Sequence, residues 1–221
     1  MSLLQPSLIF ANNAWAVILK PVGMPTQPDP SQAFSLLDWA QGQWGKAYVV
    51  NRLDRPAGGL VLMAKTSAGA AALNKLLQTG KVSKVYWVLV ENGDRLPSSS
   101  ASLEDYLLKD GRANLSRVVS PSQEGAKLAR LSYRLLAQGR TRTLLEVKLE
   151  SGRHHQIRAQ LAHLGCPVAG DLKYQASSKL RLGGIALWSY QLSFPWQKGE
   201  QTFTCKPTGP VWQPFLDMLA Q

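Results

Sequence analysis

One carboxylate, Asp54, stands between two arginines in a glycine-rich stretch, Asn51-Arg52-Leu53-Asp54-Arg55-Pro56-Ala57-Gly58-Gly59. Neighbouring cations favour the ionised form of a carboxylate, which can then act as a nucleophile or a base. A second stretch much later in the chain, Gly152-Arg153-His154-His155-Gln156-Ile157-Arg158, offers further cations. Together the two stretches suit nucleophilic chemistry on an anionic polymer.

The stretch around Asp54 also has a structural explanation. Asp and Gly commonly form turns, and flanking arginines often make surface ion pairs. The second stretch favours chemistry, because residues three apart on a helix share a face. A helix that includes both His155 and Arg158 would project them together, with Ile157 and Leu161 on the opposite side, and would aim a fixed cation at a carboxylate.

The composition indicates a folded, basic protein. Of 221 residues, 45% are hydrophobic, and 25 Lys and Arg against 14 Asp and Glu give a formal charge of +11. Such an excess favours a phosphate-bearing partner, since neutralising phosphates releases counterions. The simpler alternative is that scattered surface lysines only confer solubility.

Signals for export or a membrane are not evident in the sequence. The only cysteines are Cys166 and Cys205, so reduced thiols in the cytoplasm are a simpler reading than a disulfide scaffold. Residues 1–6 lack a basic region before a long apolar run, and no uninterrupted segment has membrane length. We expect a cytoplasmic protein.

The first half of the sequence mixes short strands with two amphipathic helices. Apolar spacing predicts a helix from Ser31, with Ser31 as N-cap, and another from Ser67 to Gly80. In the strand predicted over 84–90, alternation places Tyr86 on the face away from Trp87. The other predicted strands cover 15–19, 48–50 and 59–64.

In the second half of the sequence, one stretch has an ambiguous pattern. The stretch 128–136 is ambiguous between helix and strand, whereas alternation over 144–150 predicts a strand. A helix follows from His155 and stops at Gly165 and Pro167. Further predictions are strands at 185–187 and 202–205 and a helix at 211–219. The best linker, 96–100, is too short to establish a boundary, so we expect one domain over 1–221.

Several other chemistries lack support. All three histidines fall within a short segment near Cys166, but His155 and His163 are two helical turns apart with no acidic ligand between them, so we predict no metal. Glycine-rich phosphate loops of the nucleotide and nicotinamide types are missing, and no cofactor is predicted. The seven tryptophans are scattered rather than arranged as a stacking array.

Four ordered motifs resemble the RluA-type family of RNA pseudouridine synthases. The stretch around Asp54 is similar to the family's aspartate motif, and Lys84-Val85-Tyr86 to its Lys-x-Tyr motif. Residues 152–158 resemble the Gly-Arg-x-His-Gln-Ile-Arg element, and 165–174 continue like the family. Lys20-Pro21-Val22-Gly23 resembles its opening motif, so the likeness covers roughly residues 8 to 216.

This resemblance implies an α+β fold with a mixed, mostly antiparallel sheet, flanking helices and a central RNA-binding cleft. It also implies isomerisation of uridine within RNA. Asn51 departs from the usual histidine, and Ala57-Gly58-Gly59 from the commoner Thr-Ser-Gly. Because the catalytic-type sequence begins almost at once, we expect no separate N-terminal RNA-binding domain. The isomerisation that the resemblance implies requires no external energy source.

The resemblance also implies roles for individual residues. Asp54 is the expected catalytic carboxylate, acting on the sugar or the uracil ring or assisting proton removal. Arg158 is expected to pair with Asp54, and Tyr86 to stack on the extruded uracil, since a phenol with a pKa near 10 is a poor base. The expected RNA contacts or loop-holding residues are Arg52, Arg55, Lys84, Arg153, His155 and Gln156.

Two other classes of function remain open. An RNA-binding module that has lost its activity would use the same basic charge, and Asn51 lends this reading some support. A glycoside hydrolase would ordinarily need two carboxylates at one cleft. The expected substrate is ribosomal or transfer RNA without a named position, and the expected oligomeric state is a monomer.

Overall fold

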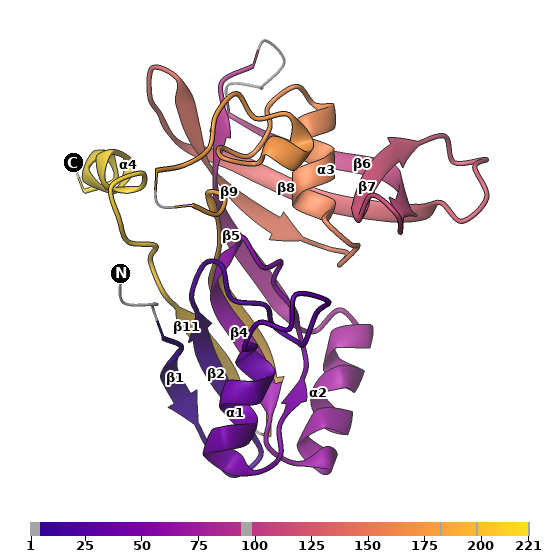
Figure 1. The fold of residues 1–221 in the computed structure, drawn as a ribbon, viewed down its shortest axis with the longest axis vertical. Coiled ribbons are helices and arrows are strands. Elements are labelled where there is room, and N and C mark those ends of the chain that lie inside the picture. Colours follow the sequence, from indigo (N-terminus) through magenta and orange to yellow (C-terminus); the bar gives the residue numbers. More distant parts are fainter. Residues whose placement is uncertain (1–4, 94–98, 182, 198, 221) are drawn as a thin grey trace. The chain divides into compact units, whose positions relative to one another are not determined.

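The computed structural model describes residues 5–93, 99–181, 183–197 and 199–220. Its contacts divide the chain into two compact units, unit 1 with residues 1–84 and 188–207, and unit 2 with residues 85–187 and 208–221. Figure 1 labels most of the helices and strands of both units. Each unit draws on early and late parts of the sequence, so no single linker separates two domains, and the single domain over 1–221 stays a prediction.

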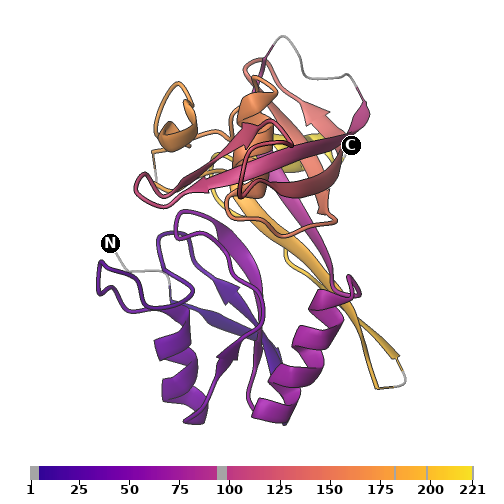
Figure 2. The ribbon, with the colours of Figure 1, turned by 90° about the vertical axis from the view of Figure 1, so that its right-hand side faces the viewer.

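Unit 1 is built on a sheet in the order β1-β2-β4-β10. β2 runs antiparallel to β1 and to β4, whereas β4 and β10 are parallel. Two strands extend the sheet beside this path, because β3 pairs with β4 and β11 with β10, and Figure 2 shows β10 and β11 as a long ribbon. The strands are β1 (Ser7–Ala11), β2 (Trp15–Lys20), β3 (Tyr48–Val49), β4 (Gly58–Ala64), β10 (Leu187–Trp196) and β11 (Gly199–Thr204).

The two helices of unit 1 are α1 (Leu36–Trp44) and α2 (Ser67–Gln78). The predicted N-cap Ser31 is wrong. Ser35 caps α1 instead, in a capping box in which its hydroxyl accepts from the Asp38 backbone and Asp38 accepts from the Ser35 backbone. Ser31 has no acidic residue three positions later, so it lacks the reciprocal half of this motif.

Gly59 lets β4 approach β10 closely. Its φ is +114°, and a Cβ at this position would lie 2.5 Å from the backbone N and O of Ser189.

We expect Gly59→Ala to lower the free energy of unfolding by about 3 kcal/mol. The added methyl group would push the backbone of Ser189 away, and alanine is strained at this positive φ. Denaturant unfolding would measure it. The matched control is Gly42→Ala on α1, where nothing lies within 4 Å, and it should stabilise by about 0.5 kcal/mol or more; equal losses would contradict the prediction.

Unit 2 contains a sheet in the order β5-β9-β8-β6-β7. The pairs β6·β7, β6·β8 and β8·β9 are antiparallel. Among the described pairings only β4·β10 is parallel, so the predicted mixed, mostly antiparallel sheet of an α+β protein is confirmed. The strands are β5 (Ser83–Glu91), β6 (Ser100–Asp110), β7 (Leu115–Val119), β8 (Lys127–Gln138) and β9 (Arg142–Leu149).

The main helix of unit 2, α3 (Gln156–His163), lies against the sheet, where it contacts β6 and β7 (Figure 1). The prediction that His155 belongs to this helix is wrong, because His155 is the left-handed residue before it, with φ 52° and ψ 24°. Every residue from Gln156 to Leu161 is buried, and His155 and Arg158 both contact Tyr174, so these two side chains do project together. A short 3-10 helix, η1 (Leu172–Tyr174), and α4 (Gln213–Met218) complete the unit.

The remaining predictions have mixed outcomes. The ambiguous stretch 128–136 is strand, and the strands and helices predicted around 15–19, 59–64, 67–80, 84–90, 144–150 and 211–219 are present. The strand predicted at 185–187 begins only at Leu187 and continues to Trp196. Residues 96–98 of the predicted linker 96–100 lie outside the described residues, and β6 starts at Ser100. Within the described chain, no helix has the length and apolar character needed to cross a membrane.

Candidate active site

Asp54 occupies the first position of a hydrogen-bonded turn at the entrance to β4. The Ala57 N–H donates to the Asp54 carbonyl at 3.0 Å, and the Asp54 residue is half-buried. The preceding Leu53 is tied to Thr26, whose hydroxyl donates to the Leu53 carbonyl at 2.8 Å and accepts from its N–H at 3.2 Å. Since both flanks are fixed to the rest of unit 1, the carboxylate has a defined location.

A fully buried ammonium, that of Lys20, lies beneath this turn. Its Nζ donates to the carbonyls of Ala57 at 2.6 Å, Met24 at 2.7 Å and Pro21 at 2.9 Å, with the Arg55 carbonyl at 3.5 Å. Burial lowers the pKa of Lys20 from 10.5 to about 7, while the negative charge of Asp54 acts in the opposite direction. Lys20 therefore joins the end of β2 to the Asp54 turn and supplies a cation beside its carboxylate.

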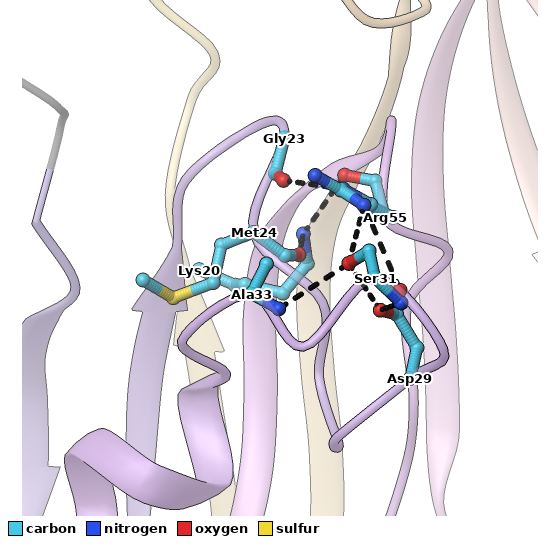
Figure 3. Close-up of polar contacts among 7 residues, drawn as sticks. All are labelled: Lys20, Gly23, Met24, Asp29, Ser31, Ala33 and Arg55. Carbon is cyan, nitrogen blue, oxygen red and sulfur yellow. Dashed lines mark hydrogen bonds and ion pairs between the residues drawn. The ribbon is translucent and has the colours of Figure 1, made fainter.

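Arg55 holds the loop that precedes α1 against the turn (Figure 3). Its Nε donates to the Gly23 carbonyl at 3.0 Å, its Nη1 donates to Ser31 Oγ at 2.8 Å, and Asp29 lies 3.8 Å away as an ion-pair partner. Ser31 in turn donates to Asp29, and the Gly23 N–H donates to the Arg55 carbonyl at 2.8 Å. Arg55 thus has the loop-holding role that the sequence left open, while its exposed guanidinium also faces solvent.

Two of the residues that depart from the family motif, Asn51 and Gly58, have defined surroundings. Asn51 is buried, and its Oδ1 accepts from the Leu62 N–H at 2.7 Å, so its side chain anchors the chain before Asp54 to β4. At Gly58, a Cβ would lie 2.5 Å from the Trp188 ring and 3.1 Å from Val22. Neighbouring side chains fill the space that a serine would need, so glycine at this position fits the packing.

In unit 2, Arg158 forms a buried bidentate ion pair with Asp171. Its Nε donates to Oδ2 at 2.6 Å and its Nη2 to Oδ1 at 2.8 Å, and the two side chains are 4% and 2% exposed. Such a fork fixes the plane of the guanidinium as well as its charge. The predicted pair between Arg158 and Asp54 joins residues of the two units and stays a prediction.

The other residues of the second stretch mainly organise unit 2. Gln156 is buried; its Oε1 accepts from Ser151 Oγ at 2.8 Å and from the Arg153 N–H at 3.0 Å. Its Nε2 donates to the Arg130 carbonyl at 2.9 Å. Arg153 is exposed, and its Nε donates to the Leu128 carbonyl at 2.8 Å. Both side chains have protein partners here, and their RNA contacts stay predictions.

Three further predicted residues differ in their exposure. Tyr86 is buried on β5 at 5% exposure, and Lys84 on the same strand is half-buried, which lowers its pKa. Arg52 is exposed, with Nη1 3.5 Å from Gln27 Oε1. An exposed, weakly held arginine next to Asp54 fits a phosphate contact better than Arg55 does.

Three residues with evident tasks at these sites received no role from the sequence. Lys20 stood in the opening motif, and Asp171 and Tyr174 stood in the stretch that continues the fourth motif. The motifs were the available signal for all three. Neither the burial of a lysine nor the pairing of Asp171 with Arg158 follows from local spacing.

The sequence of this chain matches the model of a known protein family. A family model described as RNA pseudouridylate synthase matches residues 14–163. The chain therefore belongs to the RNA pseudouridylate synthase family, in its RluA-type branch, as the motifs indicated.

Named relatives of this chain include enzymes for two kinds of RNA. The ribosomal large subunit pseudouridine synthase D of Xylella fastidiosa is 34% identical over 76% of this chain and 51% of its own length. The mitochondrial tRNA pseudouridine(32) synthase of Saccharomyces cerevisiae is 33% identical over 76% of this chain and 36% of its own. This chain spans about half the length of several curated relatives that it matches.

A solved structure supports the fold. Human RNA Pseudouridylate Synthase Domain Containing 1 superposes with a TM-score of 0.79 at 20% identity, over 97% of this chain and 86% of that one. Similarity at this level of identity concerns the fold alone.

Proposed function

We propose that this chain is an isomerase that converts uridine within RNA to pseudouridine, with Asp54 as its catalytic carboxylate. In this reaction the bond between the ribose and the uracil nitrogen breaks, the uracil turns, and a ring carbon joins the ribose. No redox change is involved, and no cofactor is needed. Arg158 and Tyr86 assist, the first as a fixed cation and the second as an aromatic face for the uracil.

The observation that carries the proposal is the support beneath Asp54. Burying a lysine ammonium costs free energy because the charge loses its water. Lys20 is buried nevertheless, with three short hydrogen bonds to carbonyls, so it is expected to have a specific role. Here the ammonium holds the Asp54 turn through these carbonyls and places a positive charge near the carboxylate that would act as nucleophile or base. A turn with only a structural role would not need a buried cation at this position.

An inactive RNA-binding module is the second reading, and Asn51 was the reason to consider it. The Asn51 side chain nevertheless keeps the turn attached to β4 through the Leu62 N–H. The departure from histidine therefore leaves Asp54 held in place, and an active enzyme is favoured.

The RNA target is proposed only as a class. The net charge of +11 fits an RNA partner, and the relatives are named for large-subunit ribosomal RNA and for transfer RNA. We propose one of these two substrates, in the cytoplasm and with a monomeric protein. An exposed cation such as Arg52 would bind phosphate while the target base is flipped out, at a cost of a few kcal/mol.

Tritium release tests the proposal. Joining the ribose to carbon five of uracil must displace the hydrogen at that carbon, so RNA labelled there should release tritium to water when it is incubated with the purified chain. Binding of the RNA without release would support the inactive module. Release of free uracil would instead indicate hydrolysis of the glycosidic bond.

Arg158→Met should lower turnover by about a hundredfold while RNA affinity changes by no more than about threefold, because a fixed cation that acts in the reaction contributes to positioning more than to binding. Single-turnover tritium release and equilibrium RNA binding would measure the two effects. Arg134→Met is the matched control, since Arg134 is an exposed arginine paired with Glu146 on the sheet of unit 2. Equal losses in rate and affinity would make Arg158 a phosphate contact.

A further inference from the structure

The side chains around Arg158 form a connected set within unit 2. The Tyr174 ring lies 5.0 Å from the Arg158 Cζ, on the guanidinium that Asp171 binds through two hydrogen bonds. Tyr174, Asp171 and Arg158 are all at least nine-tenths buried. An aromatic face and a carboxylate fork together restrain both tilt and rotation of a guanidinium.

Tyr174 is itself fixed at its hydroxyl. The oxygen accepts from the Ser116 N–H at 2.7 Å and donates to the Ser116 carbonyl at 3.2 Å, on β7. It also lies 3.1 Å from His155 Nδ1. The Tyr174 hydroxyl thus joins the backbone of Ser116 to the ring of His155.

His155 is held in turn by its backbone and its neighbour. Its left-handed conformation turns the chain into α3, and its ring stacks on that of His154 with centroids 3.9 Å apart. His154 is bonded to β7 as well, because Ser116 Oγ donates to its carbonyl at 2.8 Å and lies 3.0 Å from its Nδ1. The chain of contacts therefore runs from β7 through His155 and Tyr174 to Arg158.

We propose that Asp171 and Tyr174 are positioning residues for Arg158, and that His155 positions it indirectly through the Tyr174 hydroxyl rather than by binding RNA. The inference rests on the proposed function for its effect on catalysis. Asp171 occupies Nε and Nη2, so it fixes the direction in which the third nitrogen, Nη1, is presented. A misplacement of about 1 Å in a catalytic cation costs on the order of a hundredfold in rate, so small losses of restraint should be measurable.

Four variants separate positioning from a simple role in packing. Asp171→Asn keeps the shape but places an amide beside the guanidinium, and Tyr174→Phe keeps the ring but removes the hydroxyl. Tyr174→Leu removes the ring that packs with Leu107, Ala129 and Ala159. His155→Asn removes the imidazole while keeping a residue type that tolerates the left-handed region. The matched controls are Asp217→Asn on α4 and Tyr106→Phe on β6.

The first measurement is single-turnover tritium release beside RNA affinity for each variant. We expect a loss of rate of about a hundredfold for Asp171→Asn and about tenfold for Tyr174→Phe and His155→Asn, with affinity within about threefold of wild type. Tyr174→Leu should lose more rate than Tyr174→Phe. Proportional losses of rate and affinity, or rates that follow only the folded fraction, would overturn the inference.

The second measurement needs no activity, so it remains informative if wild type releases no tritium and the proposed function fails. The NMR signals of the Arg158 side chain report rotation about its Cζ–Nη bonds. We expect slow rotation in wild type and in both controls, and faster rotation in Asp171→Asn and Tyr174→Phe. Unchanged rotation in these two variants would refute the positioning roles, whatever the enzyme does.

Discussion

Replacing Asp54 with asparagine is expected to abolish pseudouridine formation, with a loss of rate on the order of 10⁴ or more and little change in RNA affinity. Asparagine has nearly the same shape, and the turn hydrogen bond from Ala57 goes to the backbone carbonyl, so the fold of the turn should persist. What disappears is the carboxylate beside Lys20. The effect should therefore be confined to chemistry.

Tritium release and RNA binding on the same preparations would measure the Asp54→Asn effect. Asp217→Asn is the control for a charge change elsewhere, since Asp217 accepts a hydrogen bond from Gln213 on the exposed helix α4. This control should keep nearly full activity. If Asp54→Asn also kept it, another group would have to carry the reaction.

The second large effect is expected on stability: replacing Lys20 with methionine should lower the free energy of unfolding by about 3 kcal/mol. The variant keeps the buried chain length but leaves the carbonyls of Pro21, Met24 and Ala57 without their donor, at roughly 1 kcal/mol or more for each. Denaturant unfolding would measure the loss. The matched control is Lys65→Met, which removes a half-buried ammonium bonded to one carbonyl, that of Asn12, and should cost about 1 kcal/mol.

The Lys20 effect should also depend on pH. Its pKa is about 7 in the folded chain and near 10.5 in the unfolded chain, so between these values the unfolded chain binds more protons. The free energy of unfolding of wild type should therefore rise with pH over this range, relative to Lys20→Met, by at most about 1.4 kcal/mol per pH unit. Below pH 7 the difference should level off. If the free energy of unfolding of wild type relative to Lys20→Met fell between pH 7 and pH 9, the buried, desolvated ammonium would be contradicted.

Strong periodicity made much of the fold predictable. Apolar residues at regular spacing predicted the helices α2 and α3 and the strands β2, β4 and β5. Many of these apolar residues lie in the hydrophobic core. β6 was missed because Asp105 interrupts the alternation of Ala101, Leu103 and Leu107, and among the residues of this strand only Leu107 is fully buried. The parallel pairing of β4 with β10 joins distant segments, and no local rule predicts it.

The candidate site was predicted in its residues more than in its contacts. Motifs identified Asp54, Tyr86 and Arg158, but a lysine at a strand end is ordinarily taken for a surface residue, and Lys20 is fully buried. His155 was placed inside the helix because the apolar spacing begins there, whereas its left-handed conformation has no signal in that spacing. Long-range contacts such as Arg158 with Asp171 require the fold.

The most direct measurement of the central claim is the nucleoside content of RNA after incubation with the wild-type chain and with Asp54→Asn, determined by digestion and chromatography. We predict that wild type produces pseudouridine with an equal loss of uridine and no free uracil. Asp54→Asn should bind the same RNA and produce none. RNA that wild type binds but leaves without pseudouridine, or pseudouridine formed by Asp54→Asn at the wild-type rate, would contradict the claim.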